Sequence, residues 1–240
     1  MFKNKNIWLV LVAVLIILGF AASPVAAEVS KWEQFHTGTP SALAYHDGTV
    51  VGAFPSGIWM HDGDSWEKFH DGTPSALAYH DGVVVGAFPS GIWKHDGDGW
   101  SQFHTGTPSA LAYHDGTVVG AFPSGIWKHD GDGWEKFHDG TPSALAYSDG
   151  VVVGAFPSGI WKHDGDSWSQ FHTGTPSALA YSEGVVAGAF RSGIWLHDGT
   201  GWSHFHTGTP SELAYQGGVV LGAYPSGIWV TTTLRDLMDK

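Results

Sequence analysis

Short runs of apolar residues, separated by Gly, Pro and Asp, recur along the chain from Trp32 to Trp229. One copy of the pattern contains four such runs, at residues 66–70, 75–79, 83–88 and 91–95. The second and third runs are joined by Asp81-Gly82, and Asp-Gly between apolar runs favours a tight β-hairpin because both residues tolerate positive φ. The pattern therefore predicts four short antiparallel β-strands in each copy.

The pattern has a period of 34 residues. The tryptophans show this period most clearly, in two sets of six: Trp32, Trp66, Trp100, Trp134, Trp168 and Trp202, and Trp59, Trp93, Trp127, Trp161, Trp195 and Trp229. Helical tetratricopeptide repeats have the same period. Between Gly38 and Gly227, however, no more than eight residues pass without Gly or Pro, which helix interiors do not tolerate. The repeat is therefore a unit of β-structure.

Four-stranded antiparallel sheets repeated around an axis form a β-propeller. Residues 32–36 are a lone copy of one run, and the last copy, which ends at 229–230, lacks that run. If the first run completes the last sheet, the ring closes without an unpaired edge. We therefore predict an all-β fold, a six-bladed β-propeller of four-stranded antiparallel blades in which the N-terminal strand completes the last blade. The runs rich in Gly and Ala should lie nearest the axis, and the aromatic-rich runs farthest out.

The first 27 residues differ in composition from the repeats. Lys3 and Lys5 precede an apolar run at 7–20, and residues 23–27 supply the small side chains that a signal peptidase needs. We interpret 1–27 as a secretory signal peptide and expect a secreted or extracytoplasmic protein. A retained anchor is the alternative, although the run is shorter than the roughly 20 residues that span a bilayer. The predicted propeller covers 28–230, and 231–240 form a C-terminal tail.

The charge of the chain limits its partners. The formal net charge is −12 and becomes −14 when Lys3 and Lys5 leave with the signal peptide. Phosphate binding needs clustered Lys and Arg, and the chain has only Arg191 and Arg235 as arginines, so we expect no nucleic-acid partner and no membrane contact after cleavage. The chain has no cysteine, so burial alone must stabilise the exported protein, which we expect to be a monomer.

The segment from Gly86 to Trp100 resembles the hairpin of secreted propellers with Asp-box repeats, which include the sialidase-like propellers. Their pattern is Ser-x-Asp-x-Gly-x-Thr-Trp, and Gly97 matches it three residues before Trp100. Asp96 lies one residue closer to the Trp than in that pattern, and the Ser and Thr are lacking, so the turn is Asp-box-like. The short blade is also similar to tectonin-type lectin propellers, which are six-bladed and Trp-rich. The resemblance implies the fold, and a fold does not by itself imply a function.

The repeat argues against an enzyme. A sialidase-like site would need three arginines around the substrate carboxylate, and the chain has two arginines in total. Catalysis also needs different residues in different roles at one place, whereas near-identical copies supply the same residues everywhere. We therefore assign no catalytic residue and no cofactor.

One set of histidines recurs in every copy, directly before Thr/Asp-Gly-Thr-Pro: His36, His70, His104, His138, His172 and His206. We expect this set to share one face of the ring with Pro55-Ser56-Gly57 and its copies. A ring of His, Thr and Ser near the channel mouth could bind an anion, a metal or a sugar. The alternative is that each His bonds to neighbouring backbone and pins its blade, since buried polar groups are normally satisfied locally.

Two further sets of histidines lie next to Asp-Gly turns, which should make the opposite face of the ring acidic. His46, His80 and His114 become Ser148, Ser182 and Gln216 in later copies, so no sixfold function depends on them. The set that begins with His61 could, with Asp62 and Asp64, form a weak calcium or transition-metal site. The loop is too short to wrap a cation, so we interpret these residues as turn formers and assign no metal site.

Tryptophan suits a carbohydrate site, because an indole face stacks on a sugar ring while polar neighbours bond its hydroxyls. We expect the set that begins with Trp32 to pack between blades, where each indole would bury roughly 150–250 Å². The set that begins with Trp59 could either pack or bind. The candidate ligand-binding residues are therefore the six histidines of the His36 set and Trp59, Trp93, Trp127, Trp161, Trp195 and Trp229.

These observations favour a non-catalytic, multivalent binding module for carbohydrate, with glycans or a surface protein as partners. Weak sites on one rigid ring gain avidity by factors of roughly 10²–10⁴ on a repetitive surface. The alternative is a structural or protein-interaction scaffold without a small-molecule ligand, because near-identical copies fit both functions. Four substitutions in the last two copies, Glu183, Arg191, Glu212 and Tyr224, are interpreted as drift near the ring closure, and a single specialised site there is the alternative.

Overall fold

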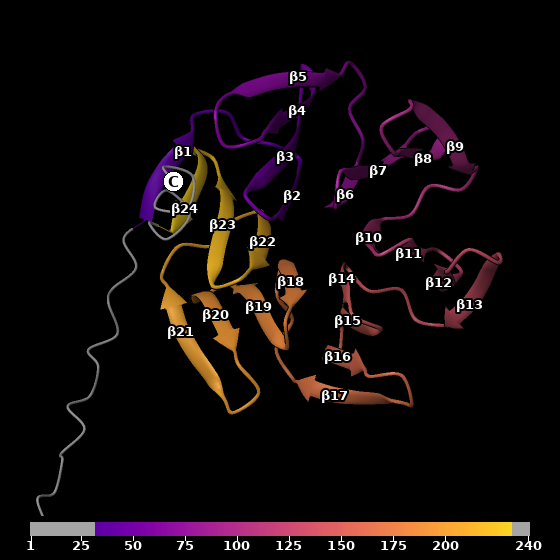
Figure 1. Cartoon of the computed structure of the whole chain (residues 1–240). Helices are drawn as coiled ribbons and strands as arrows, with labels where there is room; N and C mark the ends of the chain where they lie inside the picture. Colours follow the sequence, from indigo (N-terminus) through magenta and orange to yellow (C-terminus); the bar gives the residue numbers. More distant parts are fainter. Residues whose placement is uncertain (1–31, 232–240) are drawn as a thin grey trace, which may run out of the picture.

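The computed structural model describes residues 32–231, in which 24 β-strands form a closed ring (Figure 1). The predicted signal peptide and residues 232–240 of the predicted tail lie outside the described residues. Within 32–231, no helix is long and apolar enough to cross a membrane.

The strands pair into six sheets of four antiparallel strands, which are the blades. The first blade contains β2 (Ala42–His46), β3 (Thr49–Phe54), β4 (Gly57–His61) and β5 (Trp66–His70). The second contains β6 (Ala76–His80), β7 (Val83–Phe88), β8 (Gly91–His95) and β9 (Trp100–His104). The third contains β10 (Ala110–His114), β11 (Thr117–Phe122), β12 (Gly125–His129) and β13 (Trp134–His138). The fourth contains β14 (Ala144–Ser148), β15 (Val151–Phe156), β16 (Gly159–His163) and β17 (Trp168–His172). The fifth contains β18 (Ala178–Ser182), β19 (Val185–Phe190), β20 (Gly193–His197) and β21 (Trp202–His206).

The sixth blade joins the two ends of the chain. It contains β22 (Glu212–Gln216), β23 (Val219–Tyr224), β24 (Gly227–Thr231) and β1 (Trp32–His36). β1 pairs antiparallel with β24, so that Gln34 lies opposite Trp229, and the predicted closure is confirmed. The expectation of no unpaired edge is wrong in one respect, because the outermost strand of every blade still has a free outer edge. These strands are only five residues long, and short edges limit edge-to-edge pairing.

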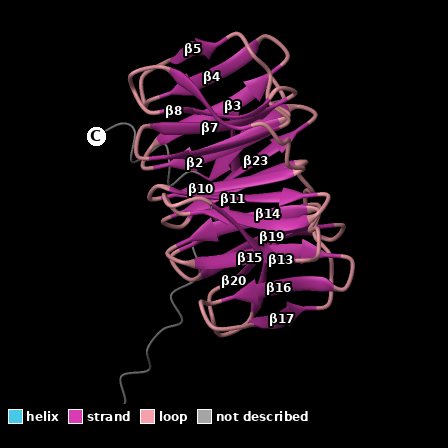
Figure 2. Cartoon of the chain, turned by 90° about the vertical axis from the view of Figure 1, so that its right-hand side faces the viewer, coloured by secondary structure: helices cyan, strands magenta, loops and turns pink. Residues whose placement is uncertain are grey.

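The innermost strands surround the axis, as the Gly and Ala content of the sequence predicts. The strands nearest the axis contact one another around the ring, and they are β2, β6, β10, β14, β18 and β22 (Figure 1). The first residues of these strands line a central channel of about 150 Å³. Each of these strands begins one residue later than predicted, at Ala76 and not Ser75 in the second blade. Figure 2 shows the connecting loops gathered at the two ends of the strands, which are the two faces of the ring.

The hydrophobic core lies between neighbouring blades. One cluster joins Val51 and Ile58 of the first blade to Leu77 and Val84 of the second, and equivalent clusters follow around the ring. Burying each such side chain stabilises the fold by roughly 1.5–3 kcal/mol. Because each cluster needs two blades, no blade has a complete core of its own.

Candidate functional site

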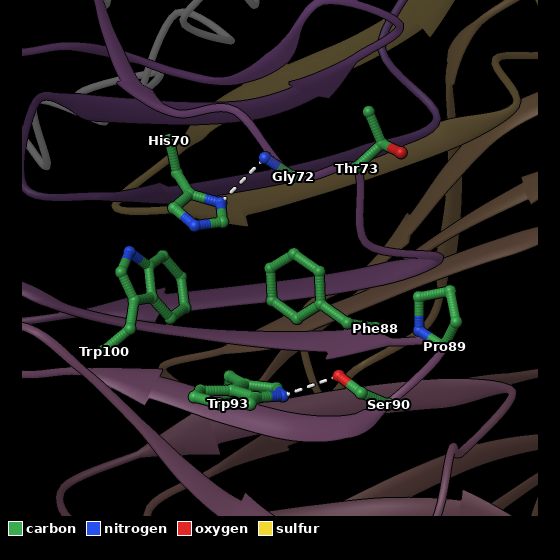
Figure 3. Close-up of a pocket in the computed structure, with 8 residues that line it drawn as sticks. All are labelled: His70, Gly72, Thr73, Phe88, Pro89, Ser90, Trp93 and Trp100. Carbon is green, nitrogen blue, oxygen red and sulfur yellow. Dashed lines mark hydrogen bonds between the residues drawn. The ribbon is translucent and has the colours of Figure 1, made fainter.

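A pocket of about 440 Å³ lies where the first blade meets the second (Figure 3). The first blade and the loop that leaves it contribute His70, Gly72 and Thr73. The second blade contributes Phe88, Pro89, Ser90, Trp93 and Trp100. Pockets that bind small molecules usually have volumes of roughly 300–1,000 Å³, so this one has a suitable size. We call it the Trp93 pocket.

Trp93 forms one side of the pocket, opposite His70 and Thr73 (Figure 3). The indole is half-buried, and its Nε1 donates a hydrogen bond to Ser90 Oγ at 2.9 Å. The equivalent bond recurs in all six copies, at 2.9–3.0 Å. The bond fixes the orientation of the ring and satisfies its only donor. The π face of the indole is therefore what Trp93 offers to a ligand.

His70 is oriented by the backbone of the loop that follows it. Its Nδ1 accepts a hydrogen bond from the N–H of Gly72 at 2.9 Å, and each copy has the same bond. A ring nitrogen that accepts carries no proton, so the neutral imidazole has its proton on Nε2. Each His of this set therefore bonds to neighbouring backbone through Nδ1, which was the alternative to ligand binding. Its Nε2–H is the group that could donate to a ligand.

Trp100 packs where neighbouring blades meet, as predicted for the set that begins with Trp32. Its ring centroid lies 4.7 Å from that of His70 and 5.6 Å from that of Phe88. It also contacts Phe69 of the neighbouring outermost strand, at 5.9 Å. Trp100 therefore supports the His70 ring while it borders the pocket.

The residue opposite the Trp93-type indole on the outermost strand varies between copies. In chain order it is Gln34, Lys68, Gln102, Lys136, Gln170 and His204. Gln102 Nε2 donates to the carbonyl of Ser90 at 2.6 Å, and Lys68 instead pairs with Asp71 at 2.5 Å. The His204 ring lies 4.9 Å from that of Trp195. The copies thus share Trp, Ser and His but differ at one position beside the indole.

The structure corrects the expected place of the His36 set. These histidines end the outermost strands and do not line the channel, because the outermost strand is the one farthest from the axis. The histidines and the Trp59 set, which the sequence analysis proposed separately, meet in one pocket, as His70 and Trp93 show. Sequence reasoning named Thr together with His and Ser but missed Phe88 as a pocket residue. The signal that could have found it is the recurrence of an aromatic residue directly before Pro-Ser-Gly or Arg-Ser-Gly every 34 residues.

The His61 set forms turns on the opposite face. His61 Nδ1 accepts from the N–H of Gly63 at 3.1 Å, and Asp64 N–H donates to Asp62 Oδ1 at 3.3 Å. The His61 ring also packs on Phe35, at 4.8 Å between centroids. Burial lowers the pKa of His61, despite the neighbouring Asp62 and Asp64 carboxylates. These contacts agree with the role of turn former.

Glu212 differs from its counterparts in the other blades. It occupies the position of Ala76 at the start of the innermost strand and lines the central channel. Burial raises the pKa of its carboxyl to about 7. This substitution therefore places an ionisable group in a part of the channel wall where the other blades have a small, uncharged side chain. The interpretation of Glu212 as drift did not include this effect.

No protein-family model matches the chain, and no curated protein sequence matches it. Solved structures resemble it in fold. The designed protein Ika8 has a TM-score of 0.50 and 22% identity, over 79% of this chain and 70% of that chain. YCF48, solved with a D1 peptide, has a TM-score of 0.53 and 13% identity, over 84% of this chain and 95% of that chain.

An extracellular domain from B. thetaiotaomicron, described as part of a hybrid two component system, has a TM-score of 0.56 and 13% identity. The match covers 80% of this chain and 32% of that chain. At these identities the likeness shows the fold and no shared activity. The chain is a six-bladed β-propeller of four-stranded blades with repeated Trp motifs, a scaffold that fits a binding or interaction role.

Proposed function

We propose that the protein is a secreted, non-catalytic, multivalent binding module for carbohydrate. The observation that carries this proposal is the meeting of Trp93, Ser90 and His70 in one pocket, with the same three residue types at a 34-residue spacing around the ring. We propose that this binding needs no cofactor and no nucleic-acid partner, and that the ring is a monomer.

The chemistry of the pocket suits a sugar. The half-buried indole of Trp93 offers a face on which the C–H side of a pyranose can stack. Ser90 Oγ already accepts from Trp93, so its own O–H can donate to a sugar hydroxyl. His70 Nε2–H supplies a second donor across the pocket. Apolar walls with a few oriented polar groups are typical of small-ligand sites.

The charge of the chain favours a neutral sugar. At a net charge of −14 once Lys3 and Lys5 leave the chain of −12, the secreted protein repels anionic glycans over distances of about a Debye length, roughly 8–10 Å at physiological salt. The position beside the indole, Lys68 in one copy and Gln102 in the next, would tune each pocket. We therefore expect neutral glycans as ligands, bound through several weak pockets at once.

A glycan array probed with the chain from residue 28 onward tests the proposal. We expect a hit on neutral glycans that the free monosaccharide abolishes. In calorimetry with the hit sugar, Trp93→Ala should lower the number of sites by one and leave the affinity of the others unchanged. Asp98→Ala, in an exposed turn on the opposite face, is the control and should change nothing. A silent array, or sugar binding that survives substitution of all six Trp59-type residues, would overturn the proposal.

One observation favours the alternative of a protein-interaction scaffold. The polar groups of the pocket already bond to each other, Trp93 to Ser90 and His70 to Gly72, as a ligand-free scaffold would require. A scaffold would give no array hit, and its binding to a protein partner would not respond to free sugar. The array and the competition experiment therefore separate the two functions.

Export is tested at the N-terminus. We expect the protein recovered outside the cytoplasm to begin at Glu28, the residue after the predicted cleavage site. Mass spectrometry of the intact secreted protein measures this directly. A chain that still begins at Met1 and stays in the membrane fraction would support the retained anchor.

A further inference from the structure

Three histidines from three successive blades meet at the end of the channel opposite the Trp93 pocket. His46, His80 and His114 end the innermost strands β2, β6 and β10. The ring centroids of His46 and His80 are 4.0 Å apart, and those of His80 and His114 are 4.1 Å apart. The set is not sixfold, so no sixfold function depends on it, but a single site has no need of sixfold symmetry.

Carboxylates lie between these rings at spacings that suit a metal ion. His46 Nδ1 is 3.4 Å from Asp81 Oδ1, and His80 Nδ1 is 3.4 Å from Asp115 Oδ1. Two ligand atoms at about 2.1 Å from a tetrahedral Zn²⁺ are roughly 3.4 Å apart, so both pairs match one edge of such a site. In each group, two imidazoles and one carboxylate place their ligand atoms within 4.8 Å of one another.

We propose that His80 and Asp81, together with His46, bind a divalent transition-metal ion, and we expect Zn²⁺. Imidazole nitrogen with carboxylate oxygen is a ligand set that suits this class of ion. The second group, His80 with His114 and Asp115, shares His80 with the first. Filling one group therefore takes a ligand from the other, and one ion binds per chain, with the fourth position left to water.

The residues around the cluster hold one ligand in place and leave another free to move toward an ion. His80 is only 7% exposed, so its ring is held in place, whereas Asp81 is exposed and its carboxylate can turn toward an ion. Asp81 has a φ of +45° in the Asp-Gly turn, and its carboxylate lies 3.4 Å from His46 Nδ1 of the neighbouring blade. Tyr79 and Tyr113 pack against His46 and His80 from the next blade.

The other half of the ring lacks the histidine ligands, which Ser148, Ser182 and Gln216 replace. Ser148 Oγ donates to Asp149 Oδ2 at 3.0 Å, and Gln216 Oε1 accepts from the N–H of Asp47 at 2.7 Å. Ser148 is 4% exposed at the position equivalent to His80, so the fold accommodates serine there. This gives a matched variant, His80→Ser, that imitates a natural copy. The proposed site is on the opposite face from the Trp93 pocket and does not depend on the carbohydrate proposal.

Calorimetric titration of the chelator-treated chain, prepared without a histidine tag, with ZnCl₂ tests the proposal. We expect one saturable site per chain and a thermal midpoint that rises with Zn²⁺, because an ion that binds only the folded state stabilises it. Loss of outer-shell partners alone weakens metal sites roughly 10–100-fold, so His80→Ser should weaken binding at least as much.

His129→Ser is the control, because His129 is on the same face but bonds to its own turn through Gly131. It should bind Zn²⁺ as the unmodified chain does. His46→Ser should weaken binding and shift the ion toward His114 and Asp115, and the double variant with His114→Ser should abolish the site. Zn²⁺ affinity and thermal shift that are unchanged in His80→Ser, or the absence of any saturable site, would overturn the proposal.

Discussion

At the scale of single residues, one glycine next to Ser90 of the Trp93 pocket allows a close approach between a turn and a strand. Gly91 begins β8 with a φ of +124°, a conformation that L side chains rarely adopt. A Cβ placed there would fall on the carbonyl oxygen of His104, the last residue of the outermost strand. The missing side chain therefore lets the turn after Ser90 approach the strand that ends the blade.

Gly91→Ala should lower the free energy of unfolding by about 2–3 kcal/mol, because backbone strain and the clash with the His104 carbonyl add. Urea unfolding followed by tryptophan fluorescence measures this. Gly97→Ala is the matched control. Gly97 also has a positive φ, +103°, but its Cβ would meet open space, so only strain remains and the loss should be about 1 kcal/mol. Equal losses in the two variants would contradict the role of the close approach.

Glu212 makes stability depend on pH. Its pKa is raised by burial to about 7 in the folded chain, from 4.5 without burial. The folded state therefore holds the proton more tightly, and the contribution of Glu212 to stability is fully present below pH 4.5 and is lost as pH rises through about 7.

Glu212→Ala introduces the residue of the other five copies. It should stabilise the chain by about 2–3 kcal/mol at pH 8, where the buried carboxylate is charged, and by little at pH 4.5. The difference in unfolding free energy between variant and parent should be measured at pH 8 and at pH 4.5. Because both chains contain the same histidines, this difference reports the ionisation of Glu212 alone. Glu67→Ala, at an exposed position of β5, is the control. A stabilisation that is the same at both pH values would contradict the assignment.

At the scale of the elements, β1 is the strand on which the ring depends. It is contributed by one end of the chain and pairs with β24 from the other. Trp32 and Phe35 of this strand pack against neighbouring aromatic rings, Trp32 on Phe205 and Phe35 on Trp66. Without β1, both neighbouring interfaces lose a wall and β24 becomes an exposed edge.

Removing β1 should therefore lower the thermal midpoint substantially. The comparison is between a chain that starts at residue 28 and one that starts at residue 37. Loss of two large aromatic side chains costs about 6–10 kcal/mol, which at roughly 2–4 °C for each kcal/mol predicts a drop of at least about 10 °C. The shorter chain should also aggregate through β24. Scanning calorimetry and light scattering measure these effects. Equal midpoints would contradict the closure.

At the scale of the whole molecule, the ring distributes its core over six interfaces between blades. No blade buries its aromatic residues without its neighbours, so the blades stabilise one another. The repetition also places the same bonded Trp–Ser pair around the circumference, the geometry that a multivalent ligand would use.

The closed ring should remain a monomer. Its outer edges are five-residue strands, and the net charge of −14 from residue 28 onward, −12 without Lys3 and Lys5, keeps copies apart. Sedimentation equilibrium of the chain from residue 28, at micromolar concentration and physiological salt, should give the monomer mass. A stable dimer mass would contradict this prediction.

The sequence by itself determined the strand pattern, the number of blades and the ring closure. The reason is that strand formation and turns depend on local chemistry, such as Asp81-Gly82, and that local chemistry recurs every 34 residues. The missing outermost strand in the last copy then left one way to complete the ring. The innermost strands were predicted to within one residue.

Only the tertiary structure decided which side chains meet. His70 and Trp93 come from different blades, so their shared pocket depends on how one blade packs on the next, which a local pattern does not encode. The same holds for His46, His80 and Asp81, whose contacts cross the interface between the first and second blades, and for Glu212, whose shifted pKa is a consequence of burial in the channel. Local periodicity determines the strands, and the distances between atoms of neighbouring blades determine the sites.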